Sequence, residues 1–287
     1  MKFGRRYRLT IEMEDGDAVI IEPPFSVRFN LVRSTMASLN TADFSIYNLA
    51  ARTRNRIFQD RFDFSAYRKI IFEAGYDTLT TVFVGSLFEA NSERIGADIV
   101  TNINSRDGGF DVVGTKTYRT IAAGSTNKEI VEQLAQDFPN LEVGAIGTFD
   151  QQYSRPVVLN GNTYELMKKY TEDKVFIDLE KVYALQDREV VPGDLQVLRG
   201  DTGLLETPKR DDAFLTVTTL FEPRIIMGQQ VRLDSEAAPE FNGDFKVIGV
   251  HHQGIISEAQ GGSAISKFQL LTGSQVFGRI EEVDQDD

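Results

Sequence analysis

The stretch Tyr7-Arg8-Leu9-Thr10-Ile11-Glu12-Met13-Glu14, followed by Asp15-Gly16 and by the apolar run from Ala18 to Ile21, decides the fold class of this chain. Apolar residues stand at every second position of its first part, with polar residues between them. This period of two is typical of a strand that buries one face. Asp-Gly between two such segments is a strong turn signal. The opening of the chain therefore predicts a β-hairpin.

The same alternation returns up to residue 103. It predicts further strands over residues 25–31, 42–46, 69–74, 80–89 and 95–103. The first hundred or so residues are therefore expected to form a β-structure.

One helix is expected to interrupt this sheet over residues 49–58. Asn48 is its predicted N-cap, because an asparagine oxygen can accept a hydrogen bond from a free N–H of the first turn. Leu49, Thr53 and Ile57 would share one face of the helix, and Arg52, Arg54 and Arg56 would spread over the rest. These arginines form either a solvated basic face or a contact surface for an acidic neighbour.

The pattern changes around Gly108-Gly109, where two short helices with readable starts follow. Thr126 and Glu129 fit a capping box, in which each side chain accepts from the other residue's backbone N–H. Asn162 and Glu165 suggest a second box, after a tight turn at Asn160-Gly161. The expected buried stripes are Ile130, Leu134 and Phe138 in the first helix and Leu166, Met167 and Tyr170 in the second. With strands expected over residues 156–159 and 174–179, this region is predicted to be a small α+β part.

From about Leu195 the alternation resumes, and it predicts strands over residues 215–221, 231–233, 245–250 and 264–270. Several short strands at regular spacing are typical of a β-barrel or sandwich. The chain is therefore predicted to be mainly β with a smaller α+β part. We expect three domains, over residues 1–108, 109–194 and 195–287, of which the last ends in an acidic tail.

Residue types that common chemistries need are scarce. The chain has no cysteine, which excludes a thiolate nucleophile and a Cys-ligated metal, and its two histidines, His251 and His252, are adjacent. Neighbouring side chains of a strand point to opposite faces, so these two cannot bind one metal together without a bulge. Ser257 does not stand in a nucleophile elbow. Gly108-Gly109 and Gly261-Gly262 fit short turns and not phosphate loops at the mouth of a helix. We therefore predict no catalytic residue, no cofactor site and no metal site.

Charge is unevenly distributed along the chain. The net charge is −12, from 31 basic and 43 acidic residues, which disfavours wholesale binding of nucleic acid. Residues 1–72 nevertheless carry 12 basic and 8 acidic residues. This imbalance is either ordinary surface variation or the mark of a region that docks onto an acidic partner. The candidate docking residues are Arg5, Arg6, Arg52, Arg54 and Arg56.

Nothing in the sequence predicts insertion into a membrane. No run of about 18 apolar residues is present, and no apolar stretch follows the N-terminal Met1–Arg6, so neither a spanning helix nor a signal peptide is expected.

Several segments, in their order and spacing, resemble the central baseplate hub proteins of phage tails and related contractile injection machines. These segments are residues 40–49 (NTADFSIYNL), 52–54 (RTR), 74–76 (AGY), 82–85 (VFVG), 203–208 (GLLETP), 220–223 (LFEP), 241–247 (FNGDFKV) and 250–254 (VHHQG). The resemblance covers most of the chain and is weakest over residues 110–190. Phe241-Asn242-Gly243 would make a hairpin that aims Phe245 and Val247 into a barrel.

This resemblance implies two tail-tube-like β-barrel domains flanking the small α+β domain. It implies a non-enzymatic structural protein of the virion, located in the tail baseplate and assembled in the host cytoplasm. Three copies would form a homotrimer that adapts a six-fold tail tube to a three-fold spike and leaves a channel for DNA, which passes without specific binding. The implied partners are the tail tube or a tube-initiator protein, the spike and the baseplate wedge proteins.

Other functions stay open at this point. A hexameric tube-initiator or distal-tail ring would also be built from tube-like barrels, with one barrel in each chain. A tail-associated peptidoglycan hydrolase needs only two carboxylates at a fixed separation, which sequence cannot measure. A carbohydrate-binding β-domain is expected to expose aromatic residues, and this chain lacks tryptophan.

Overall fold

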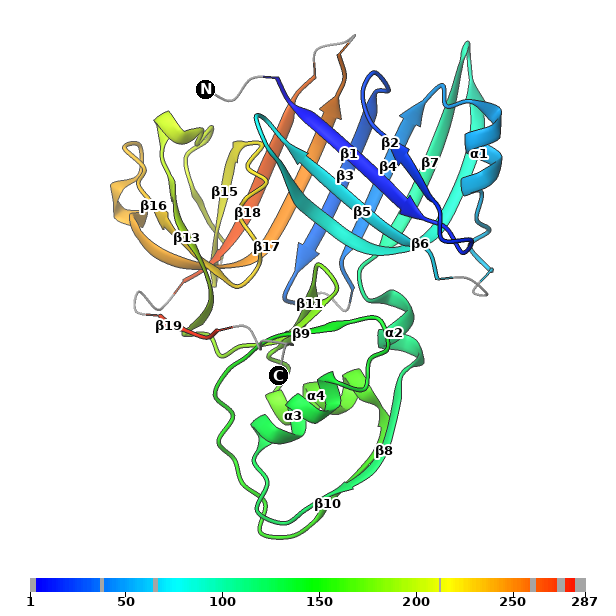
Figure 1. Cartoon of the computed structure of the whole chain (residues 1–287). Coiled ribbons are helices and arrows are strands. Elements are labelled where there is room, and N and C mark those ends of the chain that lie inside the picture. Colours follow the sequence, from blue (N-terminus) through cyan, green and yellow to red (C-terminus); the bar gives the residue numbers. More distant parts are fainter. Residues whose placement is uncertain are drawn as a thin grey trace.

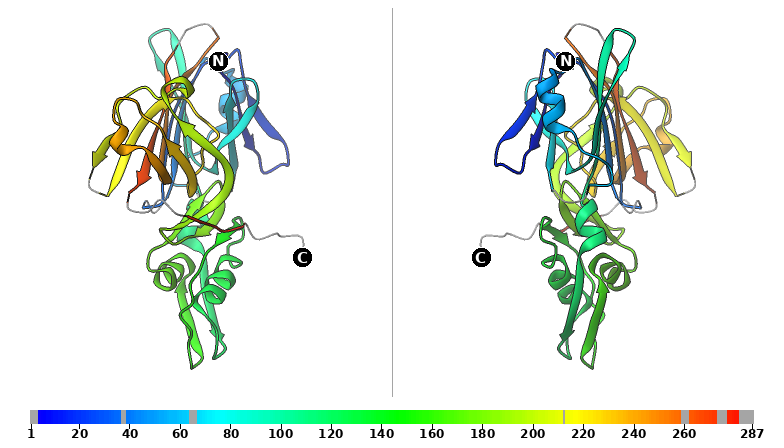
Figure 2. Two further views of the ribbon diagram at one scale, coloured as in Figure 1. Left: turned by 90° about the vertical axis from the view of Figure 1, so that its left-hand side faces the viewer. Right: turned by 90° about the vertical axis from the view of Figure 1, so that its right-hand side faces the viewer.

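The structure is a computed structural model that describes residues 4–36, 39–63, 67–211, 213–258, 262–272 and 277–281 (Figure 1). Two β segments lie side by side in the upper part of the view, and a smaller α+β unit lies below them. In both side views this unit extends away from the sheet as a narrow arm (Figure 2). The chain is mainly β, as its sequence predicts.

The first β segment contains seven strands and one short helix. These are β1 (Arg6–Glu12), β2 (Ala18–Ile21), β3 (Val27–Ser34), β4 (Thr41–Tyr47), α1 (Ala51–Ile57), β5 (Lys69–Gly75), β6 (Leu79–Ile95) and β7 (Asp98–Arg106). The predicted opening hairpin is confirmed, because β1 pairs with β2 and sets Leu9 opposite Ile21 and Ile11 opposite Val19. All four of these side chains are buried.

The α+β unit and the second β segment follow in chain order. The unit comprises α2 (Gly109–Gly114), β8 (Lys116–Ile121), α3 (Asn127–Ala135), β9 (Glu142–Ile146), β10 (Val157–Asn162), α4 (Thr163–Thr171), β11 (Val175–Asp178) and β12 (Lys181–Ala184). The second β segment comprises β13 (Glu189–Leu198), β14 (Lys209–Asp211), β15 (Phe214–Leu220), β16 (Gln229–Leu233), β17 (Gly243–Ile256), β18 (Ala264–Leu271) and β19 (Gly278–Arg279).

The two β segments share one hydrogen-bonded sheet. Its main path is β14-β15-β18-β17-β3-β4-β7-β6-β5-β1-β2, and β13 and β16 branch from β17. The segments meet where β17 pairs with β3 over eight residue pairs, from Gly249 opposite Ser34 to Ile256 opposite Val27. Backbone hydrogen bonds therefore join parts of the chain that lie more than two hundred residues apart.

The same strand order occurs twice in this sheet. The first β segment runs β3-β4-β7-β6-β5-β1, and the second runs β14-β15-β18-β17-β16-β13. Both long central strands carry a register irregularity against their hairpin partner, β6 between Leu87 and Glu89 and β17 between Val247 and Gly249. The last pair differs, because β1 is antiparallel to β5 whereas β13 is parallel to β16. The segments are thus a structural repeat that the residues themselves do not reveal.

Two local predictions in the first β segment are wrong. The predicted strand over 95–103 is interrupted by a turn at Gly96, whose φ of +64° breaks the extended backbone, so Ile95 ends β6 and Asp98 begins β7. Asn48 does not cap α1, which begins after Ala50. Asn48 lies instead in a left-handed turn, where its side chain accepts from Ile99 N (2.9 Å) and donates to Asp98 Oδ1 (2.9 Å).

Capping in the α+β unit follows the sequence more closely. The Thr126–Glu129 box is confirmed in both directions, at 3.2 and 2.9 Å. Only half of the second predicted box forms: Asn162 caps α4 by accepting from Glu165 N (3.0 Å), whereas the Glu165 carboxylate accepts from Lys168 Nζ (2.8 Å). The turn predicted at Asn160-Gly161 is wrong, because both residues continue β10 along β8. The prediction that Gly108-Gly109 does not stand at the mouth of a helix is also wrong, because Gly108 is the N-cap of α2 and Gly109 is its first residue.

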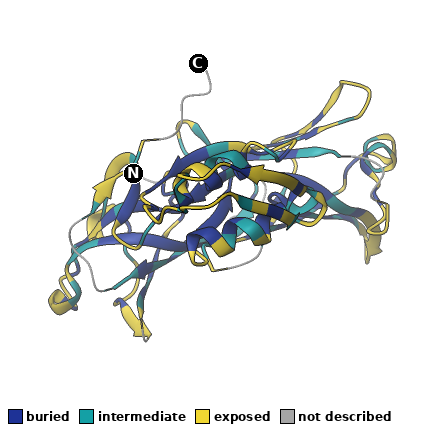
Figure 3. Cartoon of the chain, turned by 90° about the horizontal axis from the view of Figure 1, so that it is seen from below, coloured by how far each residue is buried: buried dark blue, intermediate teal, exposed yellow. Residues whose placement is uncertain are grey.

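Strands β11 and β12 are buried on both faces, which explains how the α+β unit attaches to the sheet. Val175, Ile177 and Val182 pack into the unit's own core with α3 and α4. Phe176 and Tyr183, which alternate with them, pack into the core of the second β segment and stack on each other with ring centroids 5.2 Å apart. Seen from below, exposed residues concentrate in the projecting loops and hairpins (Figure 3).

Candidate functional site

The middle of the sheet presents one polar face. Directly paired residues of neighbouring strands point to the same side of a sheet. The strand pairs therefore place nine polar side chains on one side, here called the polar sheet face: Arg28, Asn30, Asp43, Ser45, Asn102, Asn104, His251, Gln253 and Lys267. Its side chains bond across strands: Asn104 donates to Asp43 Oδ1 (2.6 Å) and Ser45 to Asn102 Oδ1 (2.9 Å). The polar sheet face is therefore a connected surface of short amide, hydroxyl and mixed-sign charged groups that spans both β segments.

The two histidines point to opposite sides of β17. His251 lies on the polar sheet face, with Nε2 2.7 Å from Asn30 Oδ1. His252 is fully buried, with Nδ1 2.7 Å from Ser266 Oγ, and it packs edge-on against Phe221 and Phe268. Burial lowers the pKa of both imidazoles, that of His252 strongly. Among the described residues, no cluster of three or more His, Asp or Glu side chains could hold a metal ion.

A buried ion pair joins the three parts of the chain. Arg33 lies on β3 at an inward-facing position and is 1% exposed. Its Nη1 lies 3.1 Å from Asp178 Oδ1 at the end of β11, and its Nη2 donates to the Ile225 carbonyl (3.5 Å) in the second β segment. Burial raises the pKa of Asp178, whereas the Arg33 guanidinium opposes that shift.

A second carboxylate supports the hairpin between β11 and β12. Leu179 and Glu180 both have positive φ, at 56° and 59°, as the two central residues of a type I′ turn require. Side chains with a Cβ adopt this conformation at a cost of roughly 1–3 kcal/mol each. Asp107, at the end of β7, accepts both of their N–H groups at 2.8 and 2.9 Å. The first β segment thereby holds the turn that brings Asp178 to Arg33.

Other polar contacts complete this junction. Asn40 donates to the Ile177 carbonyl (2.7 Å), and Glu180 pairs with Lys69 Nζ (2.8 Å) and accepts from the Tyr67 hydroxyl. Sequence reasoning did not identify this cluster. One signal was present, because Arg33 continues the inward-facing positions Val27, Phe29 and Leu31 of a strand where a fourth apolar residue is expected.

The five candidate docking arginines do not form one patch. Arg5 donates to the Gly262 carbonyl at the start of β1, and Arg6 is exposed beside it. Arg56, on α1, pairs with Asp15 (3.0 Å) and Asp17 (2.9 Å) in the turn after β1. Arg5 and Arg6 therefore lie at one end of β1 and Arg56 lies at the other, about 20 Å away for a seven-residue strand. Arg52 is exposed and Arg54 is partly buried.

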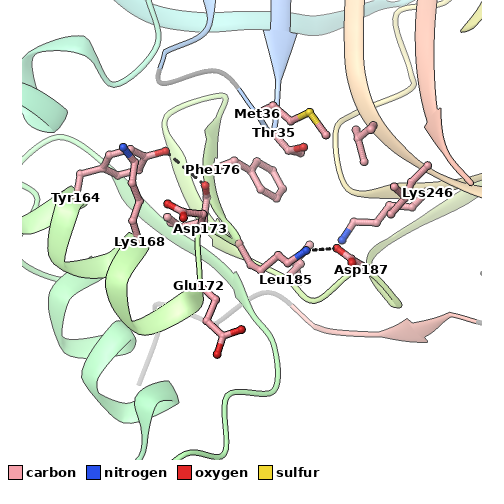
Figure 4. Close-up of a pocket in the computed structure, with 14 residues that line it drawn as sticks. Thr35, Met36, Tyr164, Lys168, Glu172, Asp173, Phe176, Leu185, Asp187 and Lys246 are labelled. Carbon is pink, nitrogen blue, oxygen red and sulfur yellow. Dashed lines mark hydrogen bonds and ion pairs between the residues drawn. The ribbon is translucent and has the colours of Figure 1, made fainter. Parts of the chain in front are cut away.

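A crevice of about 430 Å³ separates the α+β unit from the second β segment (Figure 4). Two of its lysines are already bonded: Lys174 donates to Asp187 Oδ1 (2.5 Å), and the buried Lys246 donates to the Gln186 carbonyl (2.8 Å). Burial lowers the pKa of Lys246 to about 8. The lining residues thus serve the contact between the two parts.

Solved structures with this fold are phage tail proteins and a related secretion-system component. The 43 kDa tail protein of prophage MuSo2 from Shewanella oneidensis is 10% identical, with 94% of this chain and 98% of that chain covered and a TM-score of 0.62. The tail protein from Neisseria meningitidis MC58 is 11% identical, with 95% and 98% covered and a TM-score of 0.57. The E. coli c3393 protein, a type VI secretion component described as similar to the T4 tail proteins gp27 and gp5, is 9% identical, with 88% and 74% covered and a TM-score of 0.56. At these identities the likeness shows the fold.

The fold of this chain is therefore one that occurs in tail proteins, and a family model shows the family to which the chain belongs. The model of the family described as baseplate hub gp41 matches residues 6–256, so the chain belongs to this baseplate hub family. The resemblance drawn from the sequence segments is confirmed, and the family is one of structural components of the phage tail. No curated protein matches the chain. Within the part of the chain that the structure describes, no helix is long and apolar enough to cross a membrane.

We expect Asp178→Asn to destabilise the protein by about 3–5 kcal/mol, because it leaves the buried Arg33 charge uncompensated. Arg33→Met combined with Asp178→Asn buries no charge, and it should be more stable than Asp178→Asn alone. Urea denaturation measures both free energies of unfolding. Asp244→Asn, which breaks an exposed pair with Arg232, is the control and should change little. A double variant less stable than the single one would contradict this account.

The stability difference between wild type and Lys246→Met should depend on pH. Because the pKa of Lys246 is lowered in the folded state, the unfolded chain holds more protons between pH 8 and 10.5, and the wild type gains stability as the pH rises through this range. The gain relative to Lys246→Met should be about 3 kcal/mol. Denaturation across the pH series measures it, with Lys116→Met, at an exposed position, as the control. If the stability difference between wild type and Lys246→Met did not change with pH, Lys246 would be charged in the folded protein over the whole pH range measured.

Proposed function

We propose that this chain is a central baseplate hub that assembles as a homotrimer and adapts a six-fold tail tube to a three-fold spike. The repeated strand order carries this proposal. Three chains with two similar β segments each present six similar units around a ring, which matches a six-fold tube above and leaves three-fold symmetry below. The spike, the tail tube or tube initiator and the baseplate wedge proteins are the partners that this role requires.

The proposal includes the domain division. Residues 1–108 and 195–287 are the two tube-like barrel domains, and residues 109–194 are the α+β domain between them. Strand β13 of the second β segment, which begins at Glu189, crosses the boundary at residue 195. The hydrophobic clusters support this division, since one lies mainly in the first β segment and another mainly in the α+β unit. The third combines the second β segment with Phe176, Tyr183 and Leu185 of the α+β unit.

The polar sheet face is the proposed lining of a DNA channel. Six of its groups bond to one another in pairs, namely Asn104 with Asp43, Ser45 with Asn102 and His251 with Asn30, and the basic Arg28 and Lys267 are accompanied by the acidic Asp43. A surface of this kind offers no dense array of cations to hold phosphates, so DNA would slide past without specific binding. The tail Glu281–Asp287 lies, beyond Glu281, outside the described residues.

Symmetry is the first expectation. The assembled particle should contain three copies of this 32.2 kDa chain in a ring whose six similar units are the two β segments of each copy. Electron microscopy of assembled tails measures the symmetry, and mass measurement of the purified protein reports whether the trimer forms without partners. A ring of six chains, one for every sixty degrees, would support a tube-initiator or distal-tail ring and contradict the hub.

The docking role of Arg5, Arg6, Arg52, Arg54 and Arg56 stays a prediction, and Arg6 and Arg52 are the two that the fold leaves most exposed. Arg6→Glu combined with Arg52→Glu should weaken co-sedimentation with tube or baseplate partners and make the remaining association less sensitive to salt. The melting temperature should stay nearly unchanged. Lys116→Glu combined with Lys128→Glu, on the α+β unit, is the charge-matched control. Wild-type assembly at every salt concentration would show that these arginines are only solvated.

A further inference from the structure

The strand repeat assigns an equivalent in the second β segment to each strand of the first. By position in the shared order, β6 corresponds to β17 and β3 corresponds to β14. The register irregularities align the long strands, with Leu87 and Glu89 matching Val247 and Gly249. Within one chain, β17 pairs with β3. The equivalent pair, β6 with β14, does not form within the described chain, because these strands lie in different parts of the sheet.

Among the described residues, each of these equivalent strands has an unpaired edge, which comprises residues 91–95 of β6 and all of β14. On the side away from β7, β6 pairs with β5 as far as Ser86, and Gln59 bridges Ala90 at 3.0 Å in both directions. Beyond Ala90, residues 91–95 are all exposed, and among the described residues no strand pairs with them on this side. Strand β14 is an end of the sheet path, and its three residues are exposed. Free edges of this kind are templates for pairing with another chain.

We propose that β6 of one copy pairs antiparallel with β14 of the next copy, in the register that β17 and β3 use within the chain. This inference rests on the proposed hub function and names the contact that would close its ring. The β17–β3 pairing within each chain, here called the internal junction, would then alternate around the ring with the β6–β14 pairing between chains. Three chains would have six such junctions.

The internal junction fixes the register of the proposed contact. Within the chain, His251 lies opposite Val32 and Gln253 lies opposite Asn30. The equivalent positions of the repeat would place Asn91 of one copy opposite Asp211 of the next, and Glu93 opposite Lys209. The second of these pairs sets opposite charges side by side, which stabilises a cross-strand pair. Nothing in the derivation used charge, so this complementarity is an independent observation in its favour.

The surroundings of the β6 edge have room for another strand. A groove of about 540 Å³ runs beside it, lined by Arg54, Asn55, Phe58, Asn91 and Ser92. The Phe58 ring is 57% exposed there. An incoming strand of a second copy would cover this apolar ring and add backbone pairs at the edge.

Disulfide cross-linking tests the contact directly, since the chain has no cysteine of its own. Glu93→Cys combined with Lys209→Cys should give covalent dimers and trimers on mild oxidation at rising protein concentration, read on non-reducing gels. Glu93→Cys combined with Arg210→Cys is the matched control. Arg210 would lie opposite Ser92 and face the other side of the sheet, so this variant should not cross-link.

Charge reversal gives a second measurement. Lys209→Glu should weaken self-association roughly 2–5-fold at each junction, and adding Glu93→Lys should restore it. Absence of cross-links at every concentration in the variant that combines Glu93→Cys with Lys209→Cys would overturn the edge pairing. If that variant is nonetheless trimeric by mass, the hub proposal stands without it. Covalent hexamers would support the edge contact and overturn the trimer.

Discussion

The buried contact between Arg33 and Asp178 sets a constraint on which the rest of the structure depends. A guanidinium that is 1% exposed needs a carboxylate in one place, and that carboxylate comes from another part of the chain. Asp178 reaches it because the β11–β12 turn is held by Asp107, a residue of the first β segment. The second β segment contributes the Ile225 carbonyl. One ion pair thus requires all three parts of the chain to be folded and docked together.

This constraint works together with the shared sheet. The pairing of β17 with β3 aligns the two β segments, and the polar sheet face is continuous across that pairing. The α+β unit would be free to take other positions if its only links were the chain connections at its two ends. The double-sided burial of β11 and β12 and the polar junction below β3 fix its position instead.

Much of this fold could be predicted from the sequence, and the failures have definite causes. The alternation of apolar and polar residues predicted most strands, and the Thr126–Glu129 capping box predicted the start of α3, because both patterns depend only on residues close together in the sequence. Alternation continued across Gly96 and hid a turn, since Ile95 and Ile99 keep the same period on either side of it. The resemblance implied two similar β domains, but the single sheet, the strand order of the repeat and the Arg33–Asp178 pair were not predicted, because each depends on contacts between distant segments. The five candidate arginines illustrate the same limit, because composition grouped Arg5 with Arg56, whereas the fold sets them at opposite ends of β1.

The two-sided burial of β11 and β12 also has a mechanical consequence. Phe176 and Tyr183 anchor the α+β unit in the core of the second β segment, while their neighbours in sequence anchor the same two strands to α3 and α4. A force applied at the far tip, where β8 and β10 form a narrow ribbon, passes into the sheet through this shared layer (Figure 1). Because the layer is packed on both sides, bending the arm at this contact would have to separate buried side chains from two cores at once.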